Sequence, residues 1–175
     1  LVRAAREVGL AAGEAPARRG YPASAFAELA PLLERAGLDG NGSITAFYTV
    51  LVEGNDLDEP VSDEVRGLID GHLVLDRTLA ERGHFPPLDI VKSLSRVMNQ
   101  IVSPPHRQAA QQLRAWLTHY ERKRDLVELG AVTPGADPLL DVALAKLPQI
   151  EALLRQTRDE HTELARVVAR LIAMT

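Results

Sequence analysis

The segment PLDIVKSLSRVM, residues 87–98, places one arginine, Arg96, at the end of a largely apolar run. The nearest acid before it along the chain is Asp89. A cation in apolar surroundings is costly unless a negative group meets it. That group is either an acid of this chain, with Asp89 and Asp70 as candidates, or a negative charge supplied from outside. The residues alone leave both possibilities open.

The other polar motifs do not assemble a complete active site. The five histidines show no HExxH spacing, and neither a GxSxG elbow nor a GxxxxGK[ST] phosphate loop occurs. DGNGSI, residues 39–44, resembles the middle of a calcium loop, but Gly37 and Tyr48 occupy the end positions that require Asp and Glu. We expect a plain turn there, and a solvated loop at the acids of residues 54–60. No metal site is predicted.

The composition is that of a globular protein without a strong electrostatic preference. Of 175 residues, 46% are hydrophobic and only 4% aromatic, so Leu, Val, Ile and Ala must build most of the core. A net charge of −4 gives no broad reason to bind nucleic acid. The absence of cysteine excludes disulfides and thiolate chemistry. With neither a membrane-spanning run nor a signal peptide, the sequence predicts a cytoplasmic protein.

The first hundred residues alternate between helical and strand-like segments. Residues 1–14 have the composition of an Ala-rich helix without a cap, so we expect a piece of a longer chain. A helix over 20–37 should be kinked or split by Pro31, and the apolar run 43–53 is typical of a strand covered on both faces. Further elements are a helix near 62–70, a strand at 72–75, a helical turn ending at Gly83 and an extended segment from Pro86. This alternation predicts an α/β fold with a parallel sheet.

Composition changes at SPPH, residues 103–106, and every later periodic segment is helical. Turns are expected at residues 130–138 and at Pro148. The sequence therefore predicts two domains, with part of an α/β core in 1–103 and a small helical bundle in 104–175. The apolar faces of the bundle are Leu113, Trp116, Leu117 and Tyr120; Leu139, Val142 and Ala143; Ile150, Leu153 and Leu154; and Leu164, Val167, Val168, Leu171 and Ile172.

Three blocks resemble consecutive parts of the type III secretion ATPase family, flagellar and injectisome branches together. They are RGYPASAFAELAPLLERAG, then GSITAFYTVLVEGNDLDEPVSDEVRGLIDGHLVLDRTLAERGHFPPLDI, then SLSRVMNQIVS. This family is similar to the catalytic subunits of rotary ATP synthases. The resemblance covers essentially the whole chain, yet only the C-terminal part of a family member. It implies the later strands and helices of a RecA-like nucleotide-binding core, with the phosphate-binding loop and the magnesium ligands upstream of Leu1.

The resemblance also implies roles for particular residues. In the family, the arginine of the SxSR block reaches across a subunit boundary to the γ-phosphate of ATP held with Mg²⁺ by the neighbour, and Arg96 occupies this position. Arg107 falls where rotary catalytic subunits carry an aromatic that stacks on adenine. Gln156 and Arg158 fall where the family closes the other side of the base pocket. For the last three, a surface role stays equally open.

A family member of this kind is an ATP hydrolase that works as a ring of six at the cytoplasmic face of the inner membrane. Its implied partners are export chaperones and substrates, a central stalk and stator-like proteins. By itself this piece should not hydrolyse ATP. Two alternatives remain: a non-catalytic helical interaction module, whose Val167 and Leu171 stripe docks a partner, or a subunit of a proton-translocating ATP synthase. Arg107 and the scarcity of acids around Asp137 and Asp141 argue against the synthase.

Overall fold

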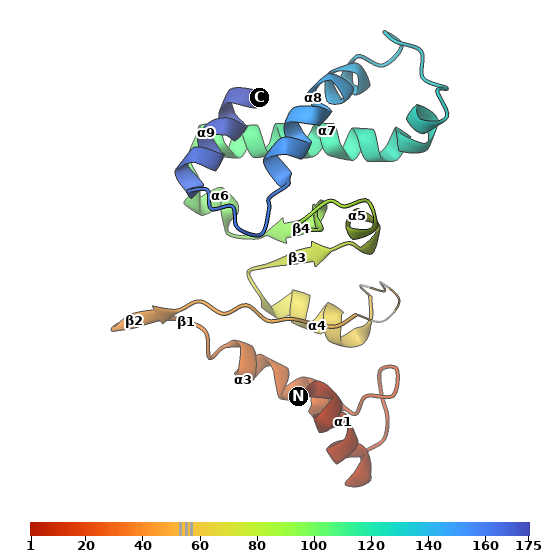
Figure 1. Cartoon of the computed structure of the whole chain (residues 1–175). Helices are drawn as coiled ribbons and strands as arrows, with labels where there is room; N and C mark the ends of the chain where they lie inside the picture. Colours follow the sequence, from red (N-terminus) through yellow and green to blue (C-terminus); the bar gives the residue numbers. More distant parts are fainter. Residues whose placement is uncertain (53, 55, 57) are drawn as a thin grey trace. The chain divides into compact units, whose positions relative to one another are not determined.

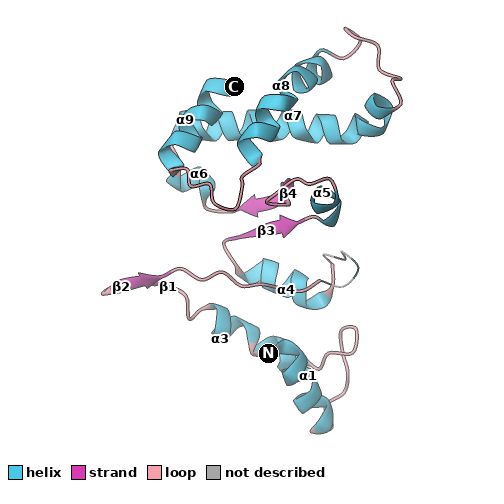
Figure 2. Cartoon of the chain, in the orientation of Figure 1, coloured by secondary structure: helices cyan, strands magenta, loops and turns pink. Residues whose placement is uncertain are grey.

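The computed structural model describes residues 1–52, 54, 56 and 58–175 (Figure 1). The described chain forms two compact units, Leu1–Asp70 and Gly71–Thr175. Figure 2 shows helices in both units, and the described strands all precede residue 103, as the sequence predicts. None of the described helices is both long and apolar enough to cross a membrane.

The helices of the first unit follow its proline positions. The helix predicted over 20–37 is split in two, and the break falls at Glu28. Pro31 has no N–H to donate to the carbonyl of Ala27, and its ring crowds that carbonyl, which explains the break. The α-helices described in this unit are α1 (Val2–Ala11), α2 (Ala23–Ala27), α3 (Leu29–Leu33) and α4 (Pro60–Leu68).

A short antiparallel hairpin follows α3. Its strands β1 (Gly37–Asp39) and β2 (Gly42–Ile44) pair with Gly37 opposite Ile44. A carboxylate oxygen of Asp39 accepts a hydrogen bond of 2.6 Å from the backbone N–H of Gly40. The calcium-like sequence therefore forms a hairpin turn, in which Asp39 satisfies the backbone of the turn.

The predicted strand at 43–53 is wrong beyond its first two residues. Residues 45–52 have no strand structure, and residue 53 lies outside the described residues. Phe47 is 87% exposed and Leu51 is 80% exposed. A strand needs hydrogen-bond partners on a neighbouring strand, and among the described strands of this unit β1 and β2 pair only with each other. The sequence pattern identified an apolar segment but could not supply a strand beside it.

The first unit buries few large apolar side chains, which lie just before α2 and on α2, α3 and α4. Tyr21, Ala25, Leu29 and Val65 are buried. At Gly9 of α1 an added Cβ would lie 2.8 Å from the Cγ atom of Pro22, so the helix approaches the start of α2 closely. Small side chains thus allow close packing of short helices in this unit.

The strands of the second unit pair antiparallel, which corrects the prediction of parallel pairing. They are β3 (Gly71–Leu75) and β4 (Leu88–Ser95), with Gly71 opposite Ser95 and Leu75 opposite Leu88. The connection holds only the short helix α5 (Arg77–Glu81), with Gly83 in a left-handed conformation after it. A helix this short cannot carry the chain back along the strand, as a parallel crossover requires.

Three long helices follow the sheet. The helices α7 (Pro104–Glu128) and α8 (Pro138–Leu154) each start with a proline at the first helical position. The third long helix is α9 (Leu164–Met174), and the short helix α6 (Met98–Ile101) lies between β4 and α7. The turn predicted at Pro148 is wrong, because α8 continues through it. Burial of Leu140 and Ala143 before Pro148 and of Ile150 after it offsets the one lost helical hydrogen bond.

The core of the second unit lies between α7, α8 and α9, which pack against one another (Figure 1). The predicted face of α7 is confirmed, as are Ala143, Ile150, Leu153 and Leu154 of α8. Leu139 and Val142, also predicted for the apolar face of α8, are instead 40% and 42% exposed. Leu171 of the α9 stripe packs against this core, whereas Leu164 is 75% exposed. The buried residues of the cluster are Leu113, Trp116, Ala143, Ile150 and Met174.

Candidate functional site

Arg96 is an exposed residue in the short link between β4 and α6. The carboxylate of Asp89, one of the acids considered as its partner, pairs with Lys92 at 2.9 Å. The other oxygen of Asp89 accepts a hydrogen bond of 2.9 Å from the backbone N–H of Lys92. Arg96 directly follows the last residue of β4.

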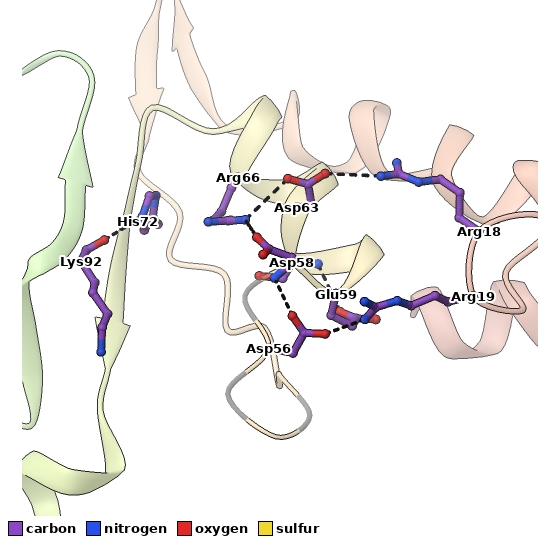
Figure 3. Close-up of polar contacts among 10 residues, drawn as sticks. Arg18, Arg19, Asp56, Asp58, Glu59, Asp63, Arg66, His72 and Lys92 are labelled. Carbon is purple, nitrogen blue, oxygen red and sulfur yellow. Dashed lines mark hydrogen bonds and ion pairs between the residues drawn. The ribbon is translucent and has the colours of Figure 1, made fainter.

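The C-terminal half of β4 is held by side-chain hydrogen bonds as well as by strand pairing. The buried hydroxyl of Ser93 accepts a hydrogen bond from the Val74 N–H at 2.9 Å and donates one to the Asp89 carbonyl at 2.6 Å. These bonds lie where the strand register shifts between His72 and Val74. The His72 ring contacts the carbonyl of Lys92 at 3.1 Å (Figure 3). An irregular strand is thus held in one conformation ahead of Arg96.

Lys92 links β4 to the start of α5. Its ammonium group donates to Asp76 at 2.9 Å, and Asp76 caps α5 by accepting from the Thr78 N–H at 2.8 Å. Hydrogen bonds from Thr78 and then from Lys92 hold the pKa of Asp76 far below its ordinary value. Hydrogen bonds to Asp76 and then to Asp89 raise the pKa of Lys92. Both groups stay charged at neutral pH, which fixes the entry into α5.

An open groove of about 730 Å³ lies between residues 83–86 and the segment 155–160 that follows α8. The backbone N–H of Gln156 donates to the Phe85 carbonyl at 2.8 Å, which joins the two walls. Phe85 is 54% exposed, and Gln156 and Arg158 both line the groove. An exposed ring beside amide and guanidinium groups suits a planar aromatic ligand.

Phe85 was not among the residues predicted from the sequence. Its signal is the aromatic of GHFPP, which lies close to a left-handed glycine and ahead of two prolines, so its backbone is restricted. Gln156 and Arg158, by contrast, were named as base-pocket residues, and the structure places both beside Phe85. The grouping depends on contact between segments far apart in the sequence.

A buried histidine supports this groove. His84 is 8% exposed, and the Arg155 side chain donates a hydrogen bond of 3.4 Å to its Nδ1 atom. Burial, and then the charge of Arg155, lower the pKa of His84. The ring is therefore neutral at pH 7 and can accept from Arg155, which orients that side chain at the groove wall.

Arg107 lies apart from the groove. It is in the first turn of α7, and its guanidinium donates to the Asn99 carbonyl of α6 at 3.2 Å. It is not among the residues that line the groove. The structure thus brings Gln156 and Arg158 together and leaves Arg107 elsewhere in the same unit.

The acids of the loop before α4 pair with arginines of the first unit (Figure 3). Asp56 accepts a hydrogen bond of 2.6 Å from Arg19, and this bond is the main reason that the pKa of Asp56 is lowered. Asp58 contacts Arg66 at 3.4 Å. Glu59 caps α4 by accepting from the Ser62 N–H at 3.2 Å. Their observed contacts are thus structural: ion pairs and a helix cap.

Potential metal ligands do not cluster among the described residues. Within 1–52, 54, 56 and 58–175, no three side chains of His, Cys, Asp or Glu converge as a metal site would require.

The chain is similar to known proteins along nearly its whole length. Residues 1–95 match the ATP synthase alpha/beta family, nucleotide-binding domain, and residues 102–173 match the T3SS EscN ATPase C-terminal domain. The type 3 secretion system ATPase of Sinorhizobium fredii is 50% identical over 173 residues, which are 99% of this chain and 38% of that protein. The flagellum-specific ATP synthase of Pseudomonas aeruginosa is 49% identical over 174 residues, 98% of this chain and 39% of that protein.

Solved structures give the same result. The assembled ATPase EscN of enteropathogenic E. coli superposes with a TM-score of 0.94 at 42% identity, covering 99% of this chain and 42% of that one. An ATP synthase subunit, NeqB of Nanoarcheaum equitans, superposes with a TM-score of 0.86 at 28% identity, over 99% of this chain and 44% of its own. The chain thus spans about two fifths of the relatives it matches. It belongs to the ATP synthase alpha/beta family, in the branch of the type 3 secretion and flagellum-specific ATPases.

Proposed function

We propose that this chain is the C-terminal part of an ATPase that energises type III protein export, and that it supplies an arginine finger to a neighbouring subunit. The observation that carries the proposal is the position of Arg96, exposed at the end of a strand that side chains hold in place. Charge spreads over the phosphoryl oxygens in the transition state of ATP hydrolysis, and a positioned guanidinium stabilises it. Arg96 would do this for ATP bound by the next subunit.

The groove at Phe85 would hold the adenine base of the nucleotide bound by the same subunit. The exposed ring of Phe85 offers a stacking surface, and Gln156 and Arg158 offer polar groups at its side. Mg²⁺ would accompany the ATP and be bound by residues outside the described part of this chain. Arg107, remote from this groove, retains its predicted contact with a nucleotide only if another subunit or another conformation brings the base to α6.

The same proposal covers the larger assembly. EscN is described as assembled, and also in complex with its central stalk EscO. We expect a hexameric ring here too, with a central stalk, stator-like proteins, export chaperones and export substrates as partners, at the cytoplasmic face of the inner membrane. Within the chain, the boundary near residue 103 would separate the nucleotide-binding core from the helical domain. This boundary falls between α6 and α7.

The test uses a full-length protein that carries this sequence. Arg96→Ala should lower kcat for ATP hydrolysis roughly 10³-fold, as loss of an arginine finger does. Phe85→Ala should instead raise KM with kcat nearly unchanged, since base contacts are equal in the ground and transition states. Arg122→Ala, on the exposed side of α7, is the matched arginine control. Near-normal turnover of Arg96→Ala would refute the catalytic assignment.

Mixed rings decide whether the arginine acts on its own subunit or on the neighbour. Subunits with Arg96→Ala are combined with subunits that lack the phosphate-loop lysine, each inactive alone. If the finger acts across the boundary, an intact loop and an intact arginine meet at some interfaces, and turnover returns. If mixed rings form but stay inactive, the arginine acts within its own subunit and the proposed mechanism is wrong.

A further inference from the structure

Arg114 of α7 makes two hydrogen bonds to the backbone of β4. One nitrogen of its guanidinium donates to the carbonyl of Val91 at 3.1 Å and to the carbonyl of Ser93 at 3.0 Å. The side chain is partly buried between the helix and the strand. Hydrogen bonds from a charged donor are about twice as strong as those between neutral groups. A helix side chain thus holds two alternate carbonyls of one strand.

These contacts lie directly ahead of Arg96. Ser93 is two residues before the end of β4 at Ser95, and Arg96 follows at once. The other strand holds the same end, because at Gly71 an added Cβ would lie only 2.6 Å from the Leu94 carbonyl oxygen. The end of β4 is therefore fixed by the β3 backbone and by the guanidinium of α7.

The same helix carries the core of the helical region. Leu113, beside Arg114 in the sequence, and Trp116 are buried in the cluster that α8 and α9 complete. A shift of α7 would therefore carry the Arg114 guanidinium with it and pull on the Val91 and Ser93 carbonyls. The position of the helical core is in this way linked to the strand end from which Arg96 projects.

We infer that Arg114 is a positioning residue, which sets the place of the Arg96 guanidinium by fixing the end of β4 to α7. This inference rests on the proposed function of Arg96. Catalysis by a positioned charge is sensitive to small displacements, since a misplacement of about 1 Å can cost roughly 10²-fold in rate. The effect of Arg114 should therefore appear in kcat and only through Arg96.

The experiment is a double-mutant cycle in the full-length ring-forming protein. Arg114→Met keeps the length of the apolar stem but removes the donors. We expect it to lower kcat roughly 10- to 100-fold, with KM for ATP within about twofold, because the lost interaction acts in the transition state. In the Arg96→Ala background the same substitution should change kcat less than about twofold, because the group it positions is gone. Arg122→Met, on the same helix, should leave both constants unchanged.

The outcomes separate the two proposals. If Arg96→Ala retains normal kcat, the proposed function fails and the positioning role fails with it. If Arg96→Ala is impaired but Arg114→Met either keeps normal kcat or loses the same factor in both backgrounds, only the positioning role is overturned. Equal losses in both backgrounds would mark a general structural defect.

A second variant covers loss of folding. Ring assembly and thermal unfolding are measured first, and if Arg114→Met does not assemble, the cycle is repeated with Arg114→Lys. The lysine keeps the charge, but its ammonium nitrogen lies one bond nearer the backbone than the Nη1 atom of Arg114, so it meets the two carbonyls less closely. We expect a loss of kcat of about threefold or more that disappears in the Arg96→Ala background. An unchanged kcat, or an equal loss in both backgrounds, would overturn the inference.

Discussion

The two compact units differ in how they bury their apolar residues. In Gly71–Thr175 three helices enclose a cluster that includes Trp116, Ile150 and Met174. In Leu1–Asp70 the core is small, and large apolar side chains such as Leu38 and Phe47 remain 89% and 87% exposed. The first unit contains apolar sequence for which its described elements provide no cover.

The difference shows what each kind of element needs. A helix satisfies its own backbone hydrogen bonds, so α7, α8 and α9 require only matching apolar faces to form a core. A strand satisfies its backbone through neighbours, so the segment 45–52 stays irregular where no strand lies beside it. Stability should therefore be concentrated in the second unit, and substitutions should separate the two.

The largest contrast is expected between two isoleucines. Ile150 of α8 is 1% exposed and Ile44 of β2 is 64% exposed. Ile150→Ala should lower the free energy of unfolding of the second unit by about 3 kcal/mol, through lost burial and a residual cavity. Ile44→Ala should stay within about 0.5 kcal/mol. Urea unfolding followed by Trp116 fluorescence reports the second unit, and amide exchange in β1 and β2 reports the first.

Equal effects of the two isoleucine variants would break the comparison, because they would mean that the hairpin contributes as much as the helical core. The fluorescence signal is specific, since Trp116 is the only tryptophan of the sequence.

A smaller contrast is expected between two glycines. An alanine Cβ at Gly71 would meet the backbone oxygen of Leu94 at 2.6 Å, which cannot move without distorting the strand pair. Gly71→Ala should therefore destabilise the second unit by about 1 to 3 kcal/mol. At Gly9 the contacts are side-chain atoms of Pro22 and Ser24, and alanine in a helix gains about 1 kcal/mol over glycine. Gly9→Ala should therefore destabilise the first unit less than Gly71→Ala destabilises the second, as measured by amide exchange in α1.

Gly40→Ala is the control for these two variants, because an added Cβ there meets nothing within 4 Å. A cost for Gly9→Ala as large as that for Gly71→Ala would show that side-chain contacts in the first unit are as rigid as backbone contacts in the second.

The smallest expected effect is the loss of stability of the second unit at low pH through Asp137. Asp137 caps α8 through the Leu140 N–H at 3.2 Å and contacts Lys123 and, at 2.7 Å, His119 of α7. The hydrogen bond from Lys123, and then that from His119, lower the pKa of Asp137. The unfolded chain therefore binds a proton at higher pH than the folded one, so this stabilisation is complete above the ordinary value of 3.8 and is lost as the pH falls below it.

Asp137→Asn should remove that dependence while keeping a capping residue. Unfolding of the second unit, followed by Trp116 fluorescence from pH 6 to pH 3, should be less sensitive to pH than in the parent chain. Asp56→Asn, which alters an ion pair of the first unit, should leave this transition unchanged. An unaltered pH dependence in Asp137→Asn would show that other groups govern the acid response.

The sequence alone determined where most of the helices lie and most of the residues that they bury. Apolar spacing identified the faces of α7 and α8, and proline and glycine positions indicated where several elements begin or end. It also identified the family, because the blocks at residues 19–37, 42–90 and 93–103 are specific. Pro148 shows the limit of such local rules, since burial on both sides kept α8 continuous through it.

Only the tertiary structure decided which segments meet. Antiparallel pairing of β3 and β4, the groove that joins Phe85 to Gln156, and the bonds from Arg114 to β4 all connect residues distant in the sequence. Periodicity reports which face of an element is apolar, but it carries no information about which carbonyl a distant guanidinium will reach. That choice follows from the packing of the whole unit, where strand pairing and helix packing fix each distance at once.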